Sequence, residues 1–142
     1  MATLTVTIQE SITLNGSERG STNTIDMTGI EQLDQRIVKV GTVEQSLVLF
    51  DTAEAAGQFA DTSVDYVRIT NLDLSNFVTL RMTAGDDEYF VKLSAGDSFV
   101  LFETVMDTDD DSGAATASLA NIDSIKAVAN SAACNVELFI AA

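Results

Sequence analysis

Apolar and polar residues alternate along one short segment after another of this 142-residue chain, and this two-residue period constrains its fold most. Over residues 3–8, leucine, valine and isoleucine share one phase while threonine occupies the other. Such alternation is typical of a strand with one buried face and one solvent face. Glu10 breaks the apolar phase, so we expect a bulge or bend over residues 9–11. Asn15-Gly16 then predicts a tight turn, because both residues tolerate positive φ.

The same period predicts strands along the rest of the chain. We expect them over residues 21–30, 36–42, 45–51, 65–72, 76–83, 88–93, 97–103, 118–129 and 135–141. Short turns join the four strands between residues 65 and 103, which predicts a meander of antiparallel neighbours. Residues 45–51 are apolar in both phases, as in a central strand covered on both faces, and residues 52–62 predict a surface loop.

Eight to ten short strands with few helices are typical of a β-sandwich or barrel. We expect an all-β fold, a single antiparallel, jelly-roll-like sandwich that spans residues 1–142. The chain contains no proline, which is one device that protects sheet edges. Its edges must therefore be protected by charge or by a neighbouring subunit.

Charge and composition make several classes of function improbable. Asp and Glu number 22 against 7 Lys and Arg, so the formal net charge is −15. Nucleic acids and anionic lipid both attract cationic surfaces, and we therefore expect neither as a partner. No apolar run is long enough to span a membrane, and residues 1–8 do not resemble a secretory signal. The chain has no histidine, which removes the commonest general base and zinc ligand.

One acidic stretch begins like a calcium-binding loop. Asp107, Asp109 and Asp111 place carboxylates at alternate positions, as a hard cation requires. However, Gly113 falls at the seventh position of the loop instead of the sixth, and Ser118 occupies the twelfth position, where a bidentate glutamate belongs. We therefore favour a solvated acidic loop and predict no metal site.

No catalytic residue or cofactor is predicted either. Paired carboxylates can hydrolyse glycosides, but the chain has no tryptophan and only two tyrosines to hold a sugar. Cys134 would need a nearby base to act as a nucleophile, and no histidine is present, so we expect a small buried hydrophobic side chain. Residues 86–88 resemble an acidic hairpin tip.

Two arginines and two phenylalanines are candidate interface residues. Arg68 and Arg81 each lie on the face of a strand opposite its aliphatic residues, and we expect the two strands to be neighbours. The more common outcome for such arginines is an exposed cross-strand ion pair; the alternative is contact with an acidic partner or with another copy of the chain. Phe99 and Phe102 bound a segment that is apolar in both phases, which fits a strand covered by a partner.

Three stretches together resemble a known class of protein. The first is Thr5-Val-Thr-Ile-Gln-Glu-Ser-Ile-Thr-Leu-Asn-Gly16, followed by residues 19–24. The second contains Arg68-Ile-Thr-Asn-Leu-Asp73 and, later, a hairpin with Leu93-Ser-Ala-Gly-Asp97; the third is residues 125–137. Over most of its length the chain is similar to small β-sandwich virion proteins of tailed bacteriophages, particularly those of marine and cyanobacterial hosts.

This resemblance implies a mechanical role. We expect a capsid decoration or cement protein, a homo-oligomer and specifically a trimer, that binds the outer surface of the major capsid protein. It would be assembled in the host cytoplasm and would need no cofactor. A high negative charge would repel packaged DNA, which favours the outer surface of the virion. The alternatives are a tail, neck or fibre-attachment module of the virion, or a module that binds a host surface or carbohydrate.

Overall fold

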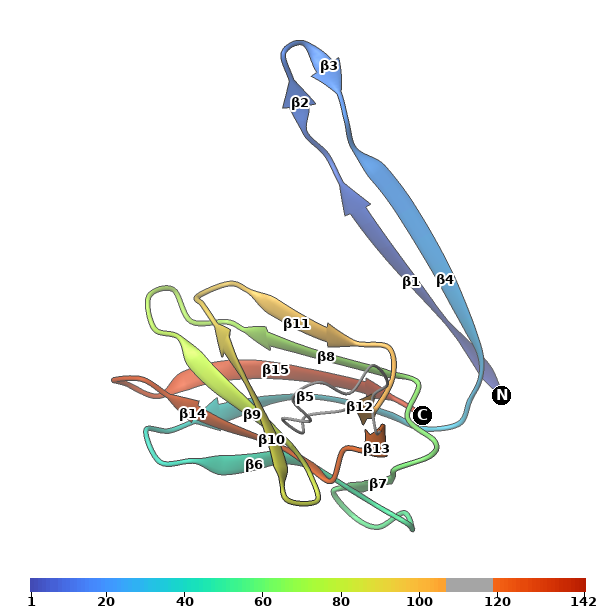
Figure 1. Ribbon diagram of the computed structural model, residues 1–142, viewed down its shortest axis with the longest axis vertical. Coiled ribbons are helices and arrows are strands. Elements are labelled where there is room, and N and C mark those ends of the chain that lie inside the picture. The colour runs from blue at the N-terminus through green and yellow to red at the C-terminus, as the bar shows by residue number, and fades with distance from the viewer. Residues whose placement is uncertain (107–118) are drawn as a thin grey trace, which may run out of the picture. The chain divides into compact units, whose positions relative to one another are not determined.

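The computed structural model describes residues 1–106 and 119–142, and these residues form strands and no helix. The chain divides into two compact units, Met1–Gln32 and Leu33–Ala142 (Figure 1). We call the first unit the arm and the second the sandwich. The expected all-β sandwich fold is confirmed. We expected it to span residues 1–142, whereas the structure builds its two layers from the second unit.

The arm is one long antiparallel hairpin. Its strands are β1 (Ala2–Glu10), β2 (Thr13–Leu14), β3 (Ser17–Glu18) and β4 (Ser21–Ile30). β1 pairs with β4 through nine residue pairs, and β2 pairs with β3 beyond them. Asn15 and Gly16 form the turn with φ of 51° and 78°, which confirms the predicted turn. β1 ends at Glu10, inside the segment where we expected an irregularity, and the register itself shifts only between Ala2 and Thr3.

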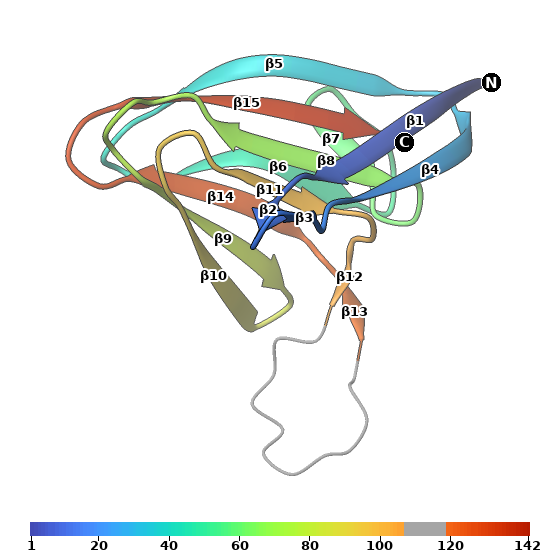
Figure 2. The ribbon, with the colours of Figure 1, turned by 90° about the horizontal axis from the view of Figure 1, so that it is seen from above.

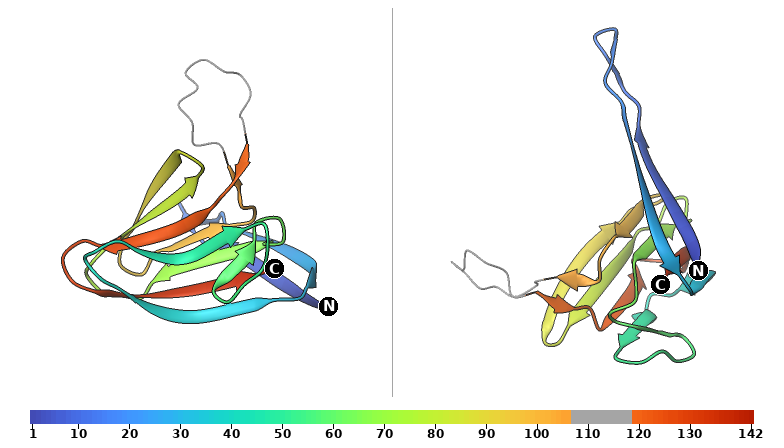
Figure 3. Two further views of the ribbon diagram at one scale, coloured as in Figure 1. Left: turned by 90° about the horizontal axis from the view of Figure 1, so that it is seen from below. Right: turned by 90° about the vertical axis from the view of Figure 1, so that its right-hand side faces the viewer.

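The sandwich contains two sheets that lie one over the other (Figure 2 and Figure 3). The five-stranded sheet has the order β10 (Asp87–Leu93), β9 (Val78–Ala84), β14 (Ser124–Ala129), β6 (Gln45–Asp51) and β7 (Gln58–Ala60). The four-stranded sheet has the order β11 (Ser98–Leu101), β8 (Tyr66–Asn71), β15 (Cys134–Ala141) and β5 (Leu33–Val40). Neighbouring strands are antiparallel except β6 and β7, which are parallel. A short pair, β12 (Val105–Met106) and β13 (Ala120–Asn121), completes the described strands.

The predicted meander between residues 65 and 103 is wrong. Only β9 and β10 form a hairpin; β8 pairs instead with β11 and β15 in the other sheet. The chain therefore crosses between the sheets after β8 and crosses back after β10. A short turn fits a crossing at the rim of a sandwich as well as a hairpin, so turn length alone does not decide which occurs.

The core lies between the two sheets. Its largest fully buried side chains come from both layers: Ile69, Leu138 and Ile140 from one sheet, and Leu80, Met82 and Ile125 from the other. The residues of the core cluster all lie between positions 40 and 142. The members of this cluster thus all belong to the second unit.

Two expectations about the segment from residue 45 to residue 62 are corrected in detail. Leu47, Val48 and Phe50 of β6 are buried, but Leu49 is 44 % exposed, so burial in both phases holds only for part of this strand. The expected surface loop contains the short strand β7, which covers the edge of β6.

Candidate interaction surfaces

Arg81 lies on the outer face of the five-stranded sheet, opposite Phe90 of β10 and Lys126 of β14. Its Nη1 donates to Glu88 Oε1 at 2.6 Å, and its Nη2 donates to Glu44. The hydrogen bond to Glu44 is the largest cause of the raised pKa of Arg81, and the bond to Glu88 adds to it. The guanidinium is therefore held by two carboxylates of its own chain.

Arg68 is held in a similar way on the four-stranded sheet. Its Nη1 lies 2.8 Å from Glu137 Oε2, and its guanidinium carbon lies 5.9 Å from the centre of the Phe139 ring. The Arg68 hydrogen bond, followed by that of Gln35, lowers the pKa of Glu137. Both arginines thus form the cross-strand ion pairs that we considered the more common outcome.

The expectation that Arg68 and Arg81 lie on neighbouring strands is wrong. β8 and β9 belong to different sheets, because the chain crosses between the layers at residues 72–77. The two arginines consequently cannot act together on one partner surface of a single sheet.

Phe99 and Phe102 lie in different environments. Phe99 pairs with Ile69 in the ladder and packs against the core. The Phe102 ring makes an edge-to-face contact with Tyr66, whose centroid is 5.5 Å away, and Tyr66 makes a second such contact with Phe139. Burial raises the pKa of Tyr66. Of the two phenylalanines proposed as interface residues, Phe99 mainly supports the core, and Phe102 belongs to an aromatic cluster at the end of the sheet.

Two large apolar side chains of the five-stranded sheet, on strands that are not neighbours, are exposed. Phe90 is 55 % exposed and Leu49 is 44 % exposed. Phe90 shares the phase of Glu88 and Lys92, which are polar, so its position in the alternation was the available signal. Phe90 and Arg81 are register partners of β10 and β9, so the two side chains lie on the same, outer face.

Apolar side chains of β1 and β4 share one face of the arm. We call this set the apolar stripe, and it consists of Leu4, Val6 and Ile8 from β1 and Ile25 and Met27 from β4. The opposite face carries threonines, and Thr5 Oγ1 donates to Asp26 at 2.8 Å there. The sheet of the arm has only two strands at this level in the described chain. Leu4, Val6, Ile25 and Met27 are half-buried, and Ile8 is 39 % exposed. An isolated two-stranded sheet is marginally stable in water, so an apolar face of this kind is a candidate contact surface.

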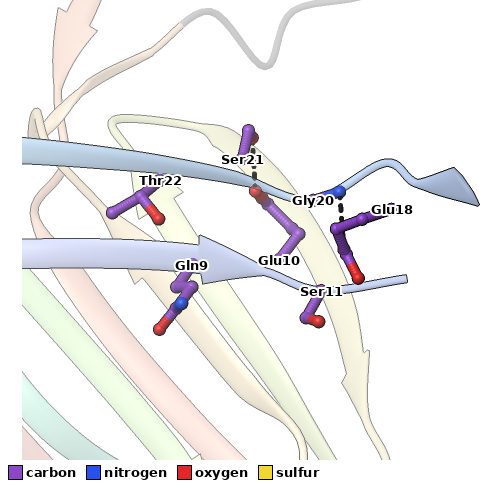
Figure 4. A pocket seen from close by; sticks show the side chains of 7 residues that line it. All are labelled: Gln9, Glu10, Ser11, Glu18, Gly20, Ser21 and Thr22. Atoms are coloured by element: carbon purple, nitrogen blue, oxygen red, sulfur yellow. Dashed lines mark hydrogen bonds between the residues drawn. The ribbon is translucent and has the colours of Figure 1, made fainter. Parts of the chain in front are cut away.

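A polar recess of about 310 Å³ lies where β1 and β4 meet the tip of the arm. Figure 4 shows its lining: Gln9, Glu10, Ser11, Glu18, Gly20, Ser21 and Thr22. Glu18 accepts hydrogen bonds from the backbone of Gly20 and Ile12, and these bonds lower its pKa. Glu10 accepts a hydrogen bond from Ser21 Oγ at 2.9 Å. Both carboxylates form hydrogen bonds within the hairpin, so the residues around the recess stabilise the hairpin itself.

The remaining sites considered from the sequence are the acidic loop and Cys134. The candidate calcium ligands Asp107, Asp109 and Asp111 lie outside the described residues. Elsewhere in the described chain, no group of three or more His, Cys, Asp or Glu side chains could hold a metal ion. Cys134 is fully buried, as expected for a small hydrophobic side chain, and burial raises the pKa of its thiol.

Two further observations bear on function. Among the described residues there is no helix with the length and apolarity needed to cross a membrane. Neither family models, nor curated proteins, nor solved structures match this chain. Its function has to be inferred from its own residues.

Proposed function

We propose that the protein is a structural component of a tailed-bacteriophage virion, specifically a capsid decoration or cement protein. It would bind the outer surface of the major capsid protein and stabilise the shell. The observation that carries this proposal is the apolar stripe of the arm. Together with the sequence resemblance to small virion proteins, it supports a molecule that works by contact with other protein chains.

The division of the chain supports a mechanical role. The residues of the core cluster all belong to the sandwich. A hairpin with one apolar face gains stability only when another surface covers that face. A segment of some thirty residues with this pattern is therefore best explained as a part that holds on to a neighbour.

Charge supports a position on the outside of a shell. A net charge of −15 keeps the free protein soluble before assembly and repels DNA inside a capsid. The paired arginines fit this view, because the guanidinium groups of Arg68 and Arg81 each form ion pairs with carboxylates of their own chain. A tail, neck or fibre-attachment position in the virion would use the same surfaces.

A carbohydrate-binding module is less well supported. Such modules stack sugars on aromatic side chains of one face. Tyr89 and Phe90 are both about half exposed, but they are consecutive residues of β10. Consecutive residues of a strand point to opposite faces, so these two rings do not form a common platform.

The proposal can be tested with virions of a phage that carries this gene. Virions without the protein should release DNA at lower temperature and after milder osmotic shock than wild-type virions. Purified protein should co-sediment with these virions and restore their resistance. Full resistance without the protein, or the absence of binding to such virions, would contradict a cementing role.

A variant pair makes this test specific to the arm. Val6→Glu places a carboxylate on the apolar stripe, and Thr7→Glu places the same group on the threonine face. We expect Thr7→Glu to restore resistance as the wild type does and Val6→Glu to restore much less. Equal restoration by both variants would show that the stripe has no part in reinforcement.

A further inference from the structure

We propose that Asn15, in the turn at the tip of the arm, is a site of spontaneous deamidation. The folded chain itself converts this side-chain amide into a carboxylate, with water as the only co-reactant and without an enzyme. The modification does not depend on the proposed function, because it uses only groups of the arm. It gives the arm a second, more acidic covalent form.

The turn at the tip holds Asn15 in an unusual backbone conformation. Asn15 and Gly16 have φ of 51° and 78°, and among the described residues Asn15 is the only residue other than glycine with a positive φ. Asparagine adopts this region more readily than most residues with a Cβ, but the conformation is still disfavoured. Only two residue pairs join β2 to β3, and all four residues are exposed. Opening this turn therefore costs little free energy.

The two groups that would react are not held by other residues. In the described chain, the side chain of Asn15 makes no hydrogen bond, and the N–H of Gly16 donates to no turn or loop acceptor. Both residues are exposed. Gly16 has no Cβ, and a Cβ built there would meet nothing within 4 Å. The side-chain amide and the backbone nitrogen that follows it are therefore both free to move and open to solvent.

The reaction has two steps. The backbone nitrogen of Gly16 loses its proton to a base in the solvent and forms a bond to Cγ of Asn15. The bond from Cγ to the side-chain nitrogen breaks, and ammonia leaves with a proton from water, so that a five-membered succinimide remains. Water then opens this ring at Cγ to give aspartate, or at the main-chain carbonyl carbon to give isoaspartate. The sum is one water consumed and one ammonia released, with no oxidation or reduction.

No other asparagine of the chain combines these conditions. Asn15 is the only one that glycine follows, and a side chain on the following residue would crowd the attacking nitrogen. Asn23 and Asn135 lie inside the paired strands β4 and β15 and precede β-branched residues. The side chains of the others form hydrogen bonds: Asn71, Asn76, Asn121 and Asn130. Deamidation should therefore be confined to the tip of the arm.

The two products affect the arm differently. Each adds one negative charge to a chain whose formal net charge is −15. Aspartate preserves the turn, because Asp-Gly favours the same two-residue turns as Asn-Gly. Isoaspartate inserts a methylene group into the main chain and so lengthens a turn that fixes the pairing of Leu14 with Ser17. We expect the isoaspartate form to lose the β2–β3 pairing and to keep the pairing of β1 with β4.

Peptide mapping by mass spectrometry, after incubation of the full chain in mildly alkaline buffer, tests the proposal. The peptide that contains Asn15 should gain one mass unit and separate into aspartate and isoaspartate forms. This reaction should be at least about tenfold faster than at any other asparagine, because glycine leaves the attacking nitrogen open. It should also accelerate as the pH rises, since Gly16 must lose its amide proton. Faster deamidation of another asparagine would overturn the proposal.

The same incubation in urea shows whether the folded turn protects the site. We expect the folded chain to react within about tenfold of the rate of the unfolded chain, because the turn opens easily. A folded chain that reacts more slowly than this would contradict the proposal, since the turn would then hold the two groups apart.

A pair of variants tests the route of the reaction. Gly16→Ala should slow the loss of ammonia at least about tenfold, because its methyl group crowds the attack. Ser17→Ala keeps the Asn-Gly pair and should react at the wild-type rate. Equal rates in the two variants would contradict attack by the nitrogen of Gly16. Because alanine at a positive φ can distort the turn, Asn15→Asp provides a second test: amide chemical shifts of residues 13–18 in one deamidated product should match those of this variant, and a mismatch of both products would contradict modification at residue 15.

Discussion

Asn71 holds together the two places where the chain crosses between the sheets. Its side chain is fully buried, and its Nδ2 lies within hydrogen-bond distance of three carbonyl oxygens: Asn76 at 2.9 Å, Leu93 at 3.1 Å and Ser94 at 3.2 Å. Its Oδ1 accepts a hydrogen bond from the backbone of Asp73 at 3.0 Å. One amide therefore links the turn after β8 to the turn after β10.

Replacing this amide should destabilise the sandwich strongly. Asn71→Leu leaves the buried carbonyl of Leu93 without its side-chain donor, and we expect the free energy of unfolding to fall by about 2–3 kcal/mol. Urea denaturation measures the change. Asn135→Leu is the matched control, because Asn135 is exposed and should change stability by less than about 0.5 kcal/mol. Similar losses in both variants would mean that the hydrogen bonds of Asn71 are not important for stability.

Asp73 gives the same corner a dependence on pH. Its carboxylate accepts hydrogen bonds from the backbone of Asn76 at 2.7 Å and Ser75 at 2.9 Å, and these bonds, that of Asn76 first, lower its pKa. A depressed pKa means that the stabilisation is present above the unfolded-state pKa of about 3.9 and is lost as the pH falls through the folded-state pKa.

The Asp73→Asn variant should therefore lose stability less steeply than the wild type when the pH falls below about 4. Thermal unfolding between about pH 6 and pH 2 measures the two slopes. Parallel curves would show that Asp73 titrates with the same pKa in the folded and unfolded states.

At the scale of the strands, local pattern predicted position better than pairing. Ser21–Ile30 and Gln45–Asp51 have the bounds that alternation indicated. The Asn15-Gly16 turn was also predictable, because its residues favour positive φ wherever they occur. Sheet membership was not, since it depends on contacts such as those of Asn71 with residues far along the chain.

For the candidate surfaces, too, the orientation of a side chain could be predicted from the sequence, whereas its partners could not. The faces of Arg68 and Arg81 could be predicted from alternation, and both arginines are indeed opposite the aliphatic residues of their strands. Their partners Glu137 and Glu44 could not, because long-range register decides which carboxylate each guanidinium meets. The apolar phase of the arm was visible in the sequence. That only two strands share this sheet was not.

The backbone near the tip of the arm leaves no room for a side chain at Gly20. A Cβ atom at this position would clash with the backbone carbonyl oxygen of Glu10 and crowd the Glu18 carboxylate. We expect Gly20→Ala to distort the arm near the tip while the sandwich stays folded. Gly41→Ala is the control, because a Cβ there meets nothing closer than 3.9 Å. Amide chemical shifts should change along β1 and β4 only in Gly20→Ala; unchanged arm signals would contradict this close approach.

At the scale of the whole molecule, stability and contact are assigned to different parts of the chain. The sandwich carries the core, with side chains such as Leu80 and Leu138 fully buried between its sheets. The arm carries an apolar face in a two-stranded sheet. Sandwich edges are short, as in β7 and β11, or carry charges, as Asp34 and Arg36 of β5 do. β1 has no charge before Glu10, so the arm is the part whose edge is least protected against pairing.

This division predicts that a chain beginning at Leu33 folds on its own. Every member of the core cluster is retained in residues 33–142, so we expect cooperative thermal unfolding with a midpoint within about 3 °C of that of the full chain at low concentration. Calorimetry of the two chains measures the effect. A broad, non-cooperative transition would mean that the sandwich needs the arm for folding.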